Sequence, residues 1–311
     1  MKAAQISEYG GASVVEVNEV GRPMAGEGQV VVEVRAASLN PFDSKIREGY
    51  MKDVIPLRFP ATLGGDIAGT VVEVGADVTG FAAGDKVYGQ AYVMGGGSGA
   101  LAEFAATRPK QIAKAPANLD LTEAASLPLV GVSALQALTE HISLQSGQKI
   151  LIHGGSGGIG TVAIQIAKHL GAYVATTVPT EVVDAAKELG ANEVIDYRTQ
   201  DFTVIIRDYD AIFDTVGGEV FEKSLAVLRP GGIAVTMAGR VDEATAKAHG
   251  VTAIAQGTGV TTERLDKLTK MIEGGIVTPH VAKVFPLSQI QEAFEYRESQ
   301  SFTGKVVIEI G

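Results

Sequence analysis

The sequence predicts an α/β protein in which a doubly wound parallel sheet is joined to a second, mostly β part. Two observations support this fold. From about residue 123, segments with the apolar spacing of strands alternate with segments that have the spacing of helices, which is typical of a parallel sheet covered by helices. Before about residue 120, short β-rich runs are separated by turn residues, which indicates a partly closed, barrel-like β part.

The first part contains three runs with the composition of strands, at residues 30–36, 69–75 and 85–89. They are rich in Val, and turn-forming Gly and Asp residues lie between them. Two short helices are expected at the transition to the second part. They are predicted at residues 123–127 and around 134–138, on either side of Pro128.

The second part repeats strand and helix in strict alternation. The expected strands are 149–153, 172–177, 193–197, 209–214, 232–238 and 251–256, and the expected helices are 158–170, 180–189, 218–228 and 262–273. This order predicts a parallel sheet of about six strands. The last segment has a helix at 287–297 and a closing strand at 304–310, which either extends this sheet or returns to the first part; we favour the return.

The junction between strand 149–153 and helix 158–170 carries the clearest functional signal. Its glycines allow a tight turn, a close approach of the backbone to a ligand, and contact between helix and sheet. The free N–H groups at the start of the helix then face an anion. The pattern predicts an NAD or NADP site. The expected contacts are Gly154, Ser156, Gly157, Gly158, Ile159 and Gly160.

Composition excludes several classes of function. The net charge is −10 and the Lys and Arg residues are scattered, which argues against a surface for nucleic acid or anionic membrane. The chain has no cysteine, so disulfides, thiolate catalysis and cysteine metal ligands are excluded. No apolar run reaches 18 residues, and residues 1–6 have the pattern of a strand rather than of a secretion signal. We therefore expect a cytoplasmic protein.

Eight stretches carry a further signal through their shared order, at residues 36–43, 64–75, 84–89, 123–128, 153–160, 189–197, 228–232 and 304–307. Taken in this order, they resemble the medium-chain dehydrogenase/reductase superfamily, in its zinc-independent quinone oxidoreductase branch, which includes ζ-crystallin. The resemblance implies a GroES-like catalytic domain formed by residues 1–122 and 279–311. It also implies a Rossmann domain at 123–278 and a homodimer.

Zinc enzymes of this superfamily carry metal ligands at two positions that hold Asn40 and Gly65 here, and their four-cysteine lobe is replaced by the glycine-rich residues 93–99. The histidines do not form a cluster with ligand spacing, so we expect surface or hydrogen-bonded structural roles for them. They are His141, His153, His169, His249 and His280. No metal site is expected.

The expected cofactor is NADPH. An NAD-binding unit usually ends its second strand with Asp or Glu, whereas this strand ends with Thr176 and Thr177. The loop at 178–182 offers no cation, however, and its Glu181 would oppose a phosphate. The resemblance implies that Tyr197 and Arg198 lie near the 2′-phosphate. It also implies cofactor contacts at Ser133, Thr215, Val216, Ala238, Gly239 and Lys305.

Without a metal, the favoured reaction is hydride transfer to a quinone or to the β-carbon of an α,β-unsaturated carbonyl. Asn40 is expected to border the nicotinamide, with a turn-capping amide as the alternative. Tyr50 would donate to the acceptor carbonyl or only shape the pocket, and Asp43 would brace the turn at Asn40. An apolar wall is expected from Met51, Phe59 and Tyr92.

Two other functions remain open. One is reduction of an enoyl thioester, as in related polyketide modules. The other is binding of NADPH without catalysis, since some members of the family serve as crystallins. Consumption of NADPH in the presence of a quinone or an enone separates the enzyme from the binding protein.

Overall fold

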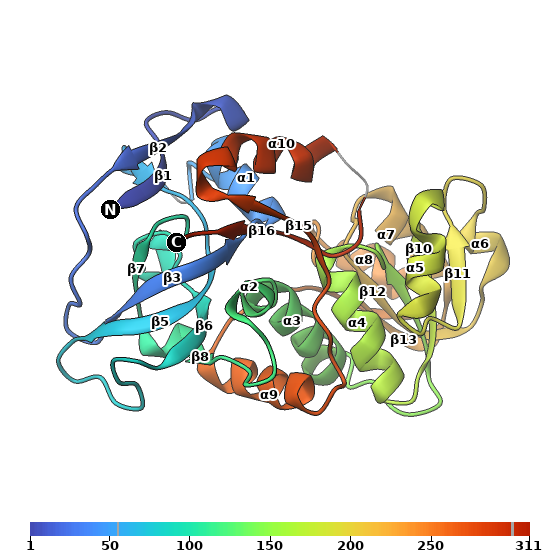
Figure 1. The fold of residues 1–311 in the computed structure, drawn as a ribbon. Coiled ribbons are helices and arrows are strands. Elements are labelled where there is room, and N and C mark those ends of the chain that lie inside the picture. Colours follow the sequence, from blue (N-terminus) through green and yellow to red (C-terminus); the bar gives the residue numbers. More distant parts are fainter. Residues whose placement is uncertain (55, 300–301) are drawn as a thin grey trace.

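The computed structural model describes residues 1–54, 56–299 and 302–311, and these form two parts side by side (Figure 1). The first part has a seven-stranded sheet of order β15-β16-β3-β5-β6-β8, in which β7 also pairs with β3, and a smaller sheet of order β2-β1-β4. Its strands are β1 (Lys2–Ile6), β2 (Val15–Glu19), β3 (Val30–Ser38), β4 (Ala61–Thr62), β5 (Asp66–Val74), β6 (Lys86–Gln90), β7 (Phe104–Thr107), β8 (Ile112–Lys114), β15 (Val281–Pro286) and β16 (Lys305–Glu309).

The second part is a six-stranded parallel sheet of order β11-β10-β9-β12-β13-β14. Its strands are β9 (Lys149–His153), β10 (Tyr173–Val178), β11 (Glu193–Asp196), β12 (Tyr209–Asp214), β13 (Leu228–Thr236) and β14 (Thr252–Ala255). Both faces are covered, because Ile150 and Ile152 of β9 pack into one buried cluster and Leu151 packs into another. The predicted doubly wound sheet is confirmed.

Short helices connect and cover these sheets. They are α1 (Pro41–Arg47), α2 (Leu121–Ala125), α3 (Pro128–Leu135), α4 (Gly158–His169), α5 (Val183–Glu188), α6 (Phe202–Ile205), α7 (Glu219–Ser224), α8 (Glu243–Ala248), α9 (Thr262–Glu273) and α10 (Ile290–Ser299). A π-helical turn at Gln136–His141 continues α3. None of the helices in the described part of the chain has the length and apolar character needed to cross a bilayer.

The last segment of the chain joins the sheet of the first part. β15 pairs in parallel with β16, and β16 pairs antiparallel with β3. In Figure 1 these two strands, in dark red, therefore lie beside the blue strands of the N-terminal segment. This arrangement brings Lys305, at the start of β16, next to the end of β3.

The start of one expected strand was wrong. The expected helix at 218–228 forms as α7 followed by a 3₁₀ turn at Leu225–Val227, but β13 already begins at Leu228 rather than at residue 232. The Pro230-Gly231-Gly232 run lies within this strand. The pairing register between β12 and β13 shifts there, between Tyr209 and Ala211, so the run forms an irregularity in the strand rather than its boundary.

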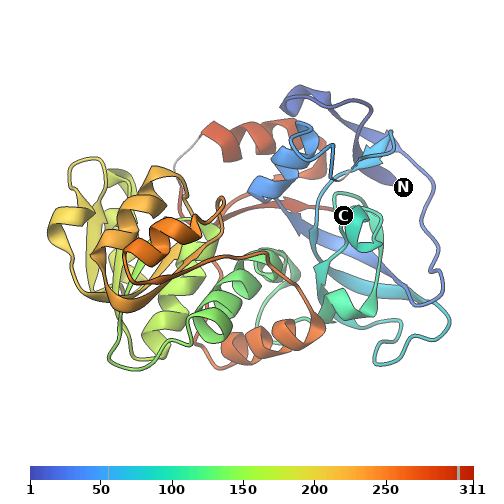
Figure 2. The ribbon, with the colours of Figure 1, turned by 180° about the vertical axis from the view of Figure 1, so that it is seen from behind.

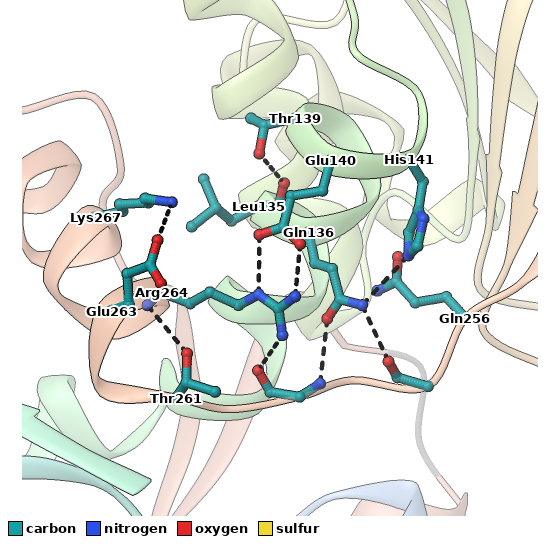
Figure 3. A network of polar contacts seen from close by, with 12 residues as sticks. Leu135, Gln136, Thr139, Glu140, His141, Gln256, Thr261, Glu263, Arg264 and Lys267 are labelled. Carbon is teal, nitrogen blue, oxygen red and sulfur yellow. Dashed lines mark hydrogen bonds and ion pairs between the residues drawn. The ribbon is translucent and has the colours of Figure 1, made fainter. Parts of the chain in front are cut away.

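α9 links the two parts, and both ribbon views show it at the bottom of the molecule between them (Figures 1 and 2). Tyr88 of β6 donates its phenol to the Leu265 carbonyl of α9 at 2.8 Å. On its other side, α9 is tied to the π-helical turn, because Arg264 donates two hydrogen bonds to Glu140 at 2.9 and 2.6 Å (Figure 3). The hydrogen bond of Tyr88 and the buried apolar cluster that Tyr88 and Leu265 share connect the two parts through α9.

Candidate functional site

A cavity of about 800 Å³ lies between the two parts. Leu39, Asn40 and Pro41 line it from the first part, and the glycine loop lines it from the second. Gly304 and Lys305 close it from the returning C-terminal segment, where the Gly304 N–H donates to the Ser156 carbonyl at 2.8 Å. The site is therefore assembled from three regions that are distant in the sequence.

The glycine loop has the geometry of an anion-binding turn. Gly154 has φ of +75°, a conformation that favours glycine, and a side chain at Gly160 would meet the Gly154 carbonyl oxygen at 2.2 Å. At Gly157 the space is open, because the nearest atom to an added Cβ is 3.4 Å away. α4 begins immediately afterwards, and no side chain caps it. Its free N–H groups can hold a diphosphate at the cavity wall.

One end of the cavity suits a nucleoside. Tyr197, Phe202, Val216 and Val220 line it there, and Thr177 lies at the end of β10. These side chains offer apolar and aromatic surface of the kind on which a base can pack. Phe202 and Val220 were not expected from the sequence. They lie on the short helices α6 and α7, and only the folded structure brings these helices to the cavity.

Thr177 and Thr176 have different roles in the structure. Thr177 lines the cavity, and its hydroxyl is hydrogen-bonded to His153 Nδ1 at 2.9 Å. Thr176 is fully buried and donates to the Ile152 carbonyl at 2.7 Å, so it does not reach the cavity. Burial lowers the pKa of His153 to about 4, so its imidazole is neutral at physiological pH.

Arg198 lies outside the cavity lining, on the surface, and forms an ion pair with Glu181. The sequence indicated a loop without a cation, but the fold brings Arg198 to that loop from the end of β11. A backbone hydrogen bond lowers the pKa of Glu181, and the hydrogen bond from Arg198 acts in the same direction. A phosphate near Tyr197 would have to compete with Glu181 for this guanidinium group.

At the other end of the cavity, Asn40 is completely buried between charged groups. Its amide nitrogen donates to Asp66 Oδ2 at 2.9 Å, and its amide oxygen accepts from Lys305 Nζ at 2.6 Å. Asn40 is also the N-cap residue of α1 and forms a capping box with Asp43, so it has a turn-capping role in addition to these two bonds. Asp43 braces this turn, because its Oδ2 accepts from the Asn40 backbone N–H at 2.6 Å.

Tyr92 holds Asp43 from the opposite side through a hydrogen bond of 2.9 Å between its phenol and Asp43 Oδ1. Burial raises the pKa of Asp43 to about 6, although the hydrogen bond from Asn40 acts in the opposite direction. The ring of Tyr92 lies directly over Gly65, where an added Cβ would be 1.9 Å from Cε2. A side chain at position 65 has no room, so the metal-ligand position of zinc relatives is filled by an aromatic ring.

The chemistry of this pocket does not suit a metal ion. Among the residues that the structure describes, no three His, Cys, Asp or Glu side chains gather closely enough to hold one. Lys305 instead places a cation beside Asn40. A metal ion bound by Asn40 would be repelled by this buried ammonium group, which lies 2.6 Å from Asn40 Oδ1.

Asp66 is a buried carboxylate that the sequence analysis missed. It accepts hydrogen bonds from Asn40, from Gln90 Nε2 at 2.9 Å and from the Leu129 backbone N–H at 3.3 Å. Burial raises the pKa of Asp66, and the nearby Lys305 charge acts against this rise. Its position at the start of β5, directly after two glycines, was the only signal in the sequence.

The predicted residues separate into two groups. Those that line the cavity are Asn40, Gly154, Ser156, Gly157, Gly158, Ile159, Thr177, Tyr197, Thr215, Val216 and Lys305. Those outside its lining are Tyr50, Asp43, Ser133, Gly160, Thr176, Arg198, Ala238 and Gly239. Tyr50 is 76% exposed at the end of α1, so the structure does not bring its phenol to the cavity. The Ser133 hydroxyl is bonded to the Leu129 carbonyl and to Thr258 instead.

Two family models match this chain. The alcohol dehydrogenase GroES-like domain matches residues 26–117, and the zinc-binding dehydrogenase model matches residues 189–308. The second name describes the wider family, whose metal-ligand positions differ here, as the packing of Tyr92 over Gly65 shows.

Characterised relatives align along nearly the whole chain. A 2-methylene-furan-3-one reductase of Solanum lycopersicum is 37% identical, and the match covers 99% of this chain and 79% of that protein. An NADPH-dependent alkenal/one oxidoreductase of Arabidopsis thaliana, a chloroplastic protein, is 36% identical with the same coverage.

A solved structure shares the complete fold. The quinone oxidoreductase from Coxiella burnetii superposes with a TM-score of 0.92 at 32% identity, and the match covers 100% of this chain and 99% of that one. The fold described above thus occurs along its whole length in a known structure. The chain belongs to the medium-chain dehydrogenase/reductase superfamily, in its zinc-independent quinone oxidoreductase branch.

Proposed function

We propose that this protein binds NADPH and transfers hydride from it to a quinone or to an α,β-unsaturated carbonyl compound. The observation that carries the proposal is the cavity between the glycine loop and the Asn40–Lys305 pair. The activities for which the relatives are named, which are reductions of alkenals, enones and quinones, support it. When bound, NADPH supplies the hydride.

The residues of the chain would bind and orient the reactants. The N–H groups at the start of α4 would hold the diphosphate, and the apolar end near Phe202 and Val216 would hold the adenosine. Neither Asp nor Glu ends β10, so no carboxylate there repels a 2′-phosphate. Asn40 and Lys305 would then border the reacting end of the cofactor. Lys305, held by its hydrogen bond to Asn40, would offer an N–H donor to negative charge that develops on the acceptor.

We further propose the domain boundaries given above, with residues 1–122 and 279–311 as the catalytic domain and 123–278 as the Rossmann domain. A homodimer and the absence of nucleic-acid or membrane partners are part of the same proposal. A cytoplasmic location stays a prediction, which fractionation of the producing cells would test.

The proposal is tested by mixing the protein with NADPH and following its absorbance after addition of a small quinone, an enone or a short enoyl thioester. We expect consumption with the first two. Consumption with the thioester alone would assign the protein to the enoyl reductases, and binding of NADPH without consumption would make it a binding protein.

A matched pair of variants tests the location of the site. Gly157→Val adds a side chain to the glycine loop, where the protein leaves room for it, so the fold should remain intact. The side chain would occupy the space of the diphosphate, so NADPH binding should be lost. Gly21→Val is the control and should bind NADPH normally, because Gly21 lies outside the cavity lining and an added Cβ there meets no atom within 4 Å. Normal binding by Gly157→Val would place the cofactor elsewhere.

A further inference from the structure

Lys305 is a buried lysine whose ammonium group lies at the wall of the cavity. Two of its three N–H bonds are donated, one to the Leu39 carbonyl and one to Asn40 Oδ1. Both acceptors belong to residues that line the cavity. No other residue in the described ranges accepts a hydrogen bond from this nitrogen, so its third N–H is available to a ligand.

The surrounding elements fix the lysine in this position. Its alkyl chain lies against Gly158 at the start of α4, where an added Cβ would be 2.7 Å from Lys305 Cδ. At the other end, the amide of Asn40 is held by Asp66 and cannot turn without losing both bonds. The ammonium group is therefore placed between the glycine loop and the Asn40 turn.

Charged groups on three other elements act on Lys305. Asp66 on β5 and Asp43 on α1 stabilise its protonated form, whereas Arg297 on α10 opposes it. Burial has the largest effect, and the pKa of Lys305 falls to about 8. An ordinary lysine has a pKa near 10.4 and releases its proton slowly at neutral pH.

We propose that Lys305 donates the proton that completes the reduction, with Asn40 and Asp66 as positioning residues. This inference rests on the proposed function. Addition of hydride to the β-carbon of an enone forms a C–H bond, and the electron pair of the C=C bond moves toward the α-carbon and the carbonyl oxygen. One N–H bond of Lys305 then breaks, and its proton forms a C–H bond at the α-carbon. Water returns a proton to the amine.

The hydrogen-bond pattern fits this step. The neutral amine retains two N–H bonds, which is the number that Leu39 and Asn40 accept. The lysine can therefore give up its third proton without moving and without leaving either acceptor unpaired. The nitrogen lone pair then occupies the direction of the lost proton, where it can accept a new one.

Three variants test the proposal with an enone as acceptor. Lys305→Ala should lower kcat by about 10²-fold, because general acid catalysis contributes about 10²- to 10⁴-fold. Lys305→Arg keeps the positive charge but does not release a proton at neutral pH, so it should lose a similar factor while NADPH affinity stays within about threefold. Lys187→Met removes an exposed lysine of α5 and is the control with wild-type rates.

Chemical rescue separates proton donation from a structural role. Methylamine or ethylamine should restore the rate of Lys305→Ala in proportion to the amine concentration, and salts of equal ionic strength without an acidic proton should not. In the wild type, kcat should fall as the pH rises through the pKa of Lys305. Asp66→Asn removes a stabilising negative charge, so this fall should begin at a lower pH.

A measurement without cofactor or turnover completes the test. In protein carrying ¹³C at the lysine ε-carbons, one resonance should titrate near pH 8 and be absent from Lys305→Arg. That resonance should titrate at a lower pH in Asp66→Asn.

Wild-type kcat in Lys305→Arg at every pH, or no rescue by amines, would overturn the role of Lys305 alone. A wild-type protein that consumes no NADPH with any acceptor would overturn the proposed function and this inference together. An unshifted lysine titration would remove the physical basis of proton donation. Rescue, a shifted pH profile and the shifted resonance together would establish it.

Discussion

At the residue scale, the packing of Tyr92 over Gly65 explains how this protein differs from its zinc-binding relatives. An added Cβ at position 65 would lie 1.9 Å from Tyr92 Cε2, and the ring is only 8% exposed. We expect Gly65→Ala to lower the free energy of unfolding by about 1–3 kcal/mol, which is typical of overpacking. Urea denaturation measures this loss.

A double-mutant comparison isolates the cause. In a Tyr92→Leu background the ring is absent, so Gly65→Ala should cost almost nothing. In Tyr92→Phe the ring remains and only the hydrogen bond to Asp43 is lost, so the cost should persist. Equal costs in all three backgrounds would show that the backbone at position 65, and not the ring, excludes a side chain.

Arg198 and Glu181 carry the second residue-scale prediction, which concerns the choice of cofactor. If the 2′-phosphate binds near Tyr197, Glu181→Gln should free the Arg198 guanidinium and tighten NADPH binding about two- to fivefold, the range expected for an exposed ion pair. NADH lacks this phosphate, so its affinity should not change. Fluorescence titration with both cofactors measures the difference.

Asp184→Asn is the matched control, since Asp184 forms an exposed ion pair with Lys187 on the neighbouring helix turn. It should change neither affinity. A parallel change in NADPH and NADH affinity in Glu181→Gln would show a general electrostatic effect. It would then argue against a phosphate contact at Arg198.

At the element scale, α9 carries one ion pair that joins it to another element and one that lies within the helix itself. Arg264 makes two hydrogen bonds to Glu140 and a third, of 2.7 Å, to the Gly259 carbonyl, whereas Lys267 pairs only with Glu263 four residues earlier (Figure 3). We expect Arg264→Met to cost about 1–2 kcal/mol, because a planar guanidinium in a fixed geometry stabilises more than an exposed pair.

Lys267→Met provides the internal control. Its pair with Glu263 is exposed on both sides, so removing it should cost about 0.5 kcal/mol or less. Thermal or urea unfolding of both variants measures the contrast. Equal losses would mean that Arg264 does not fix the loop between β14 and α9.

The same scale shows what the sequence could predict. The glycine loop and the strand before it have local signals, namely a short run of consecutive apolar residues followed by closely spaced glycines, and both were predicted within one residue. Lys305, Asp66 and Asn40 lie far apart in the chain and meet only because β16 pairs with β3 and β3 pairs with β5. No local sequence pattern predicts contacts that depend on strand pairing, so Asp66 was missed.

Tyr50 was placed at the reacting centre because it lies ten residues after Asn40, close in sequence. α1 intervenes, however, and carries Tyr50 to an exposed position at its far end. Sequence proximity was a poor guide here because one helix of two turns displaces its end by about 10 Å. Arg198 is close in space to a residue that is not close in sequence. The pairing of β10 with β11 brings it to Glu181, in the loop after β10.

At the scale of the whole molecule, the six-stranded sheet ends at β14, whose outer edge has no partner strand within the described part of the chain. Thr252 and Ala255 are exposed along it. An edge strand of this kind invites pairing with another copy, and an isologous contact between two β14 strands would make a continuous sheet. We predict a homodimer formed in this way.

The hydrogen bonds of β14 indicate a selective test. The Gln256 N–H donates to the Thr236 carbonyl of β13, and because consecutive residues of a strand point to opposite sides, the Ala255 N–H faces outward. Ala255→Pro should therefore remove an edge donor without breaking the pairing with β13, and it should weaken the dimer at least tenfold. Ala255→Val keeps the donor and should remain dimeric. Light scattering over a concentration series distinguishes these results. A wild-type protein that is monomeric at micromolar concentration would contradict the predicted dimer. Equal dissociation constants for both variants would place the contact between copies on another surface.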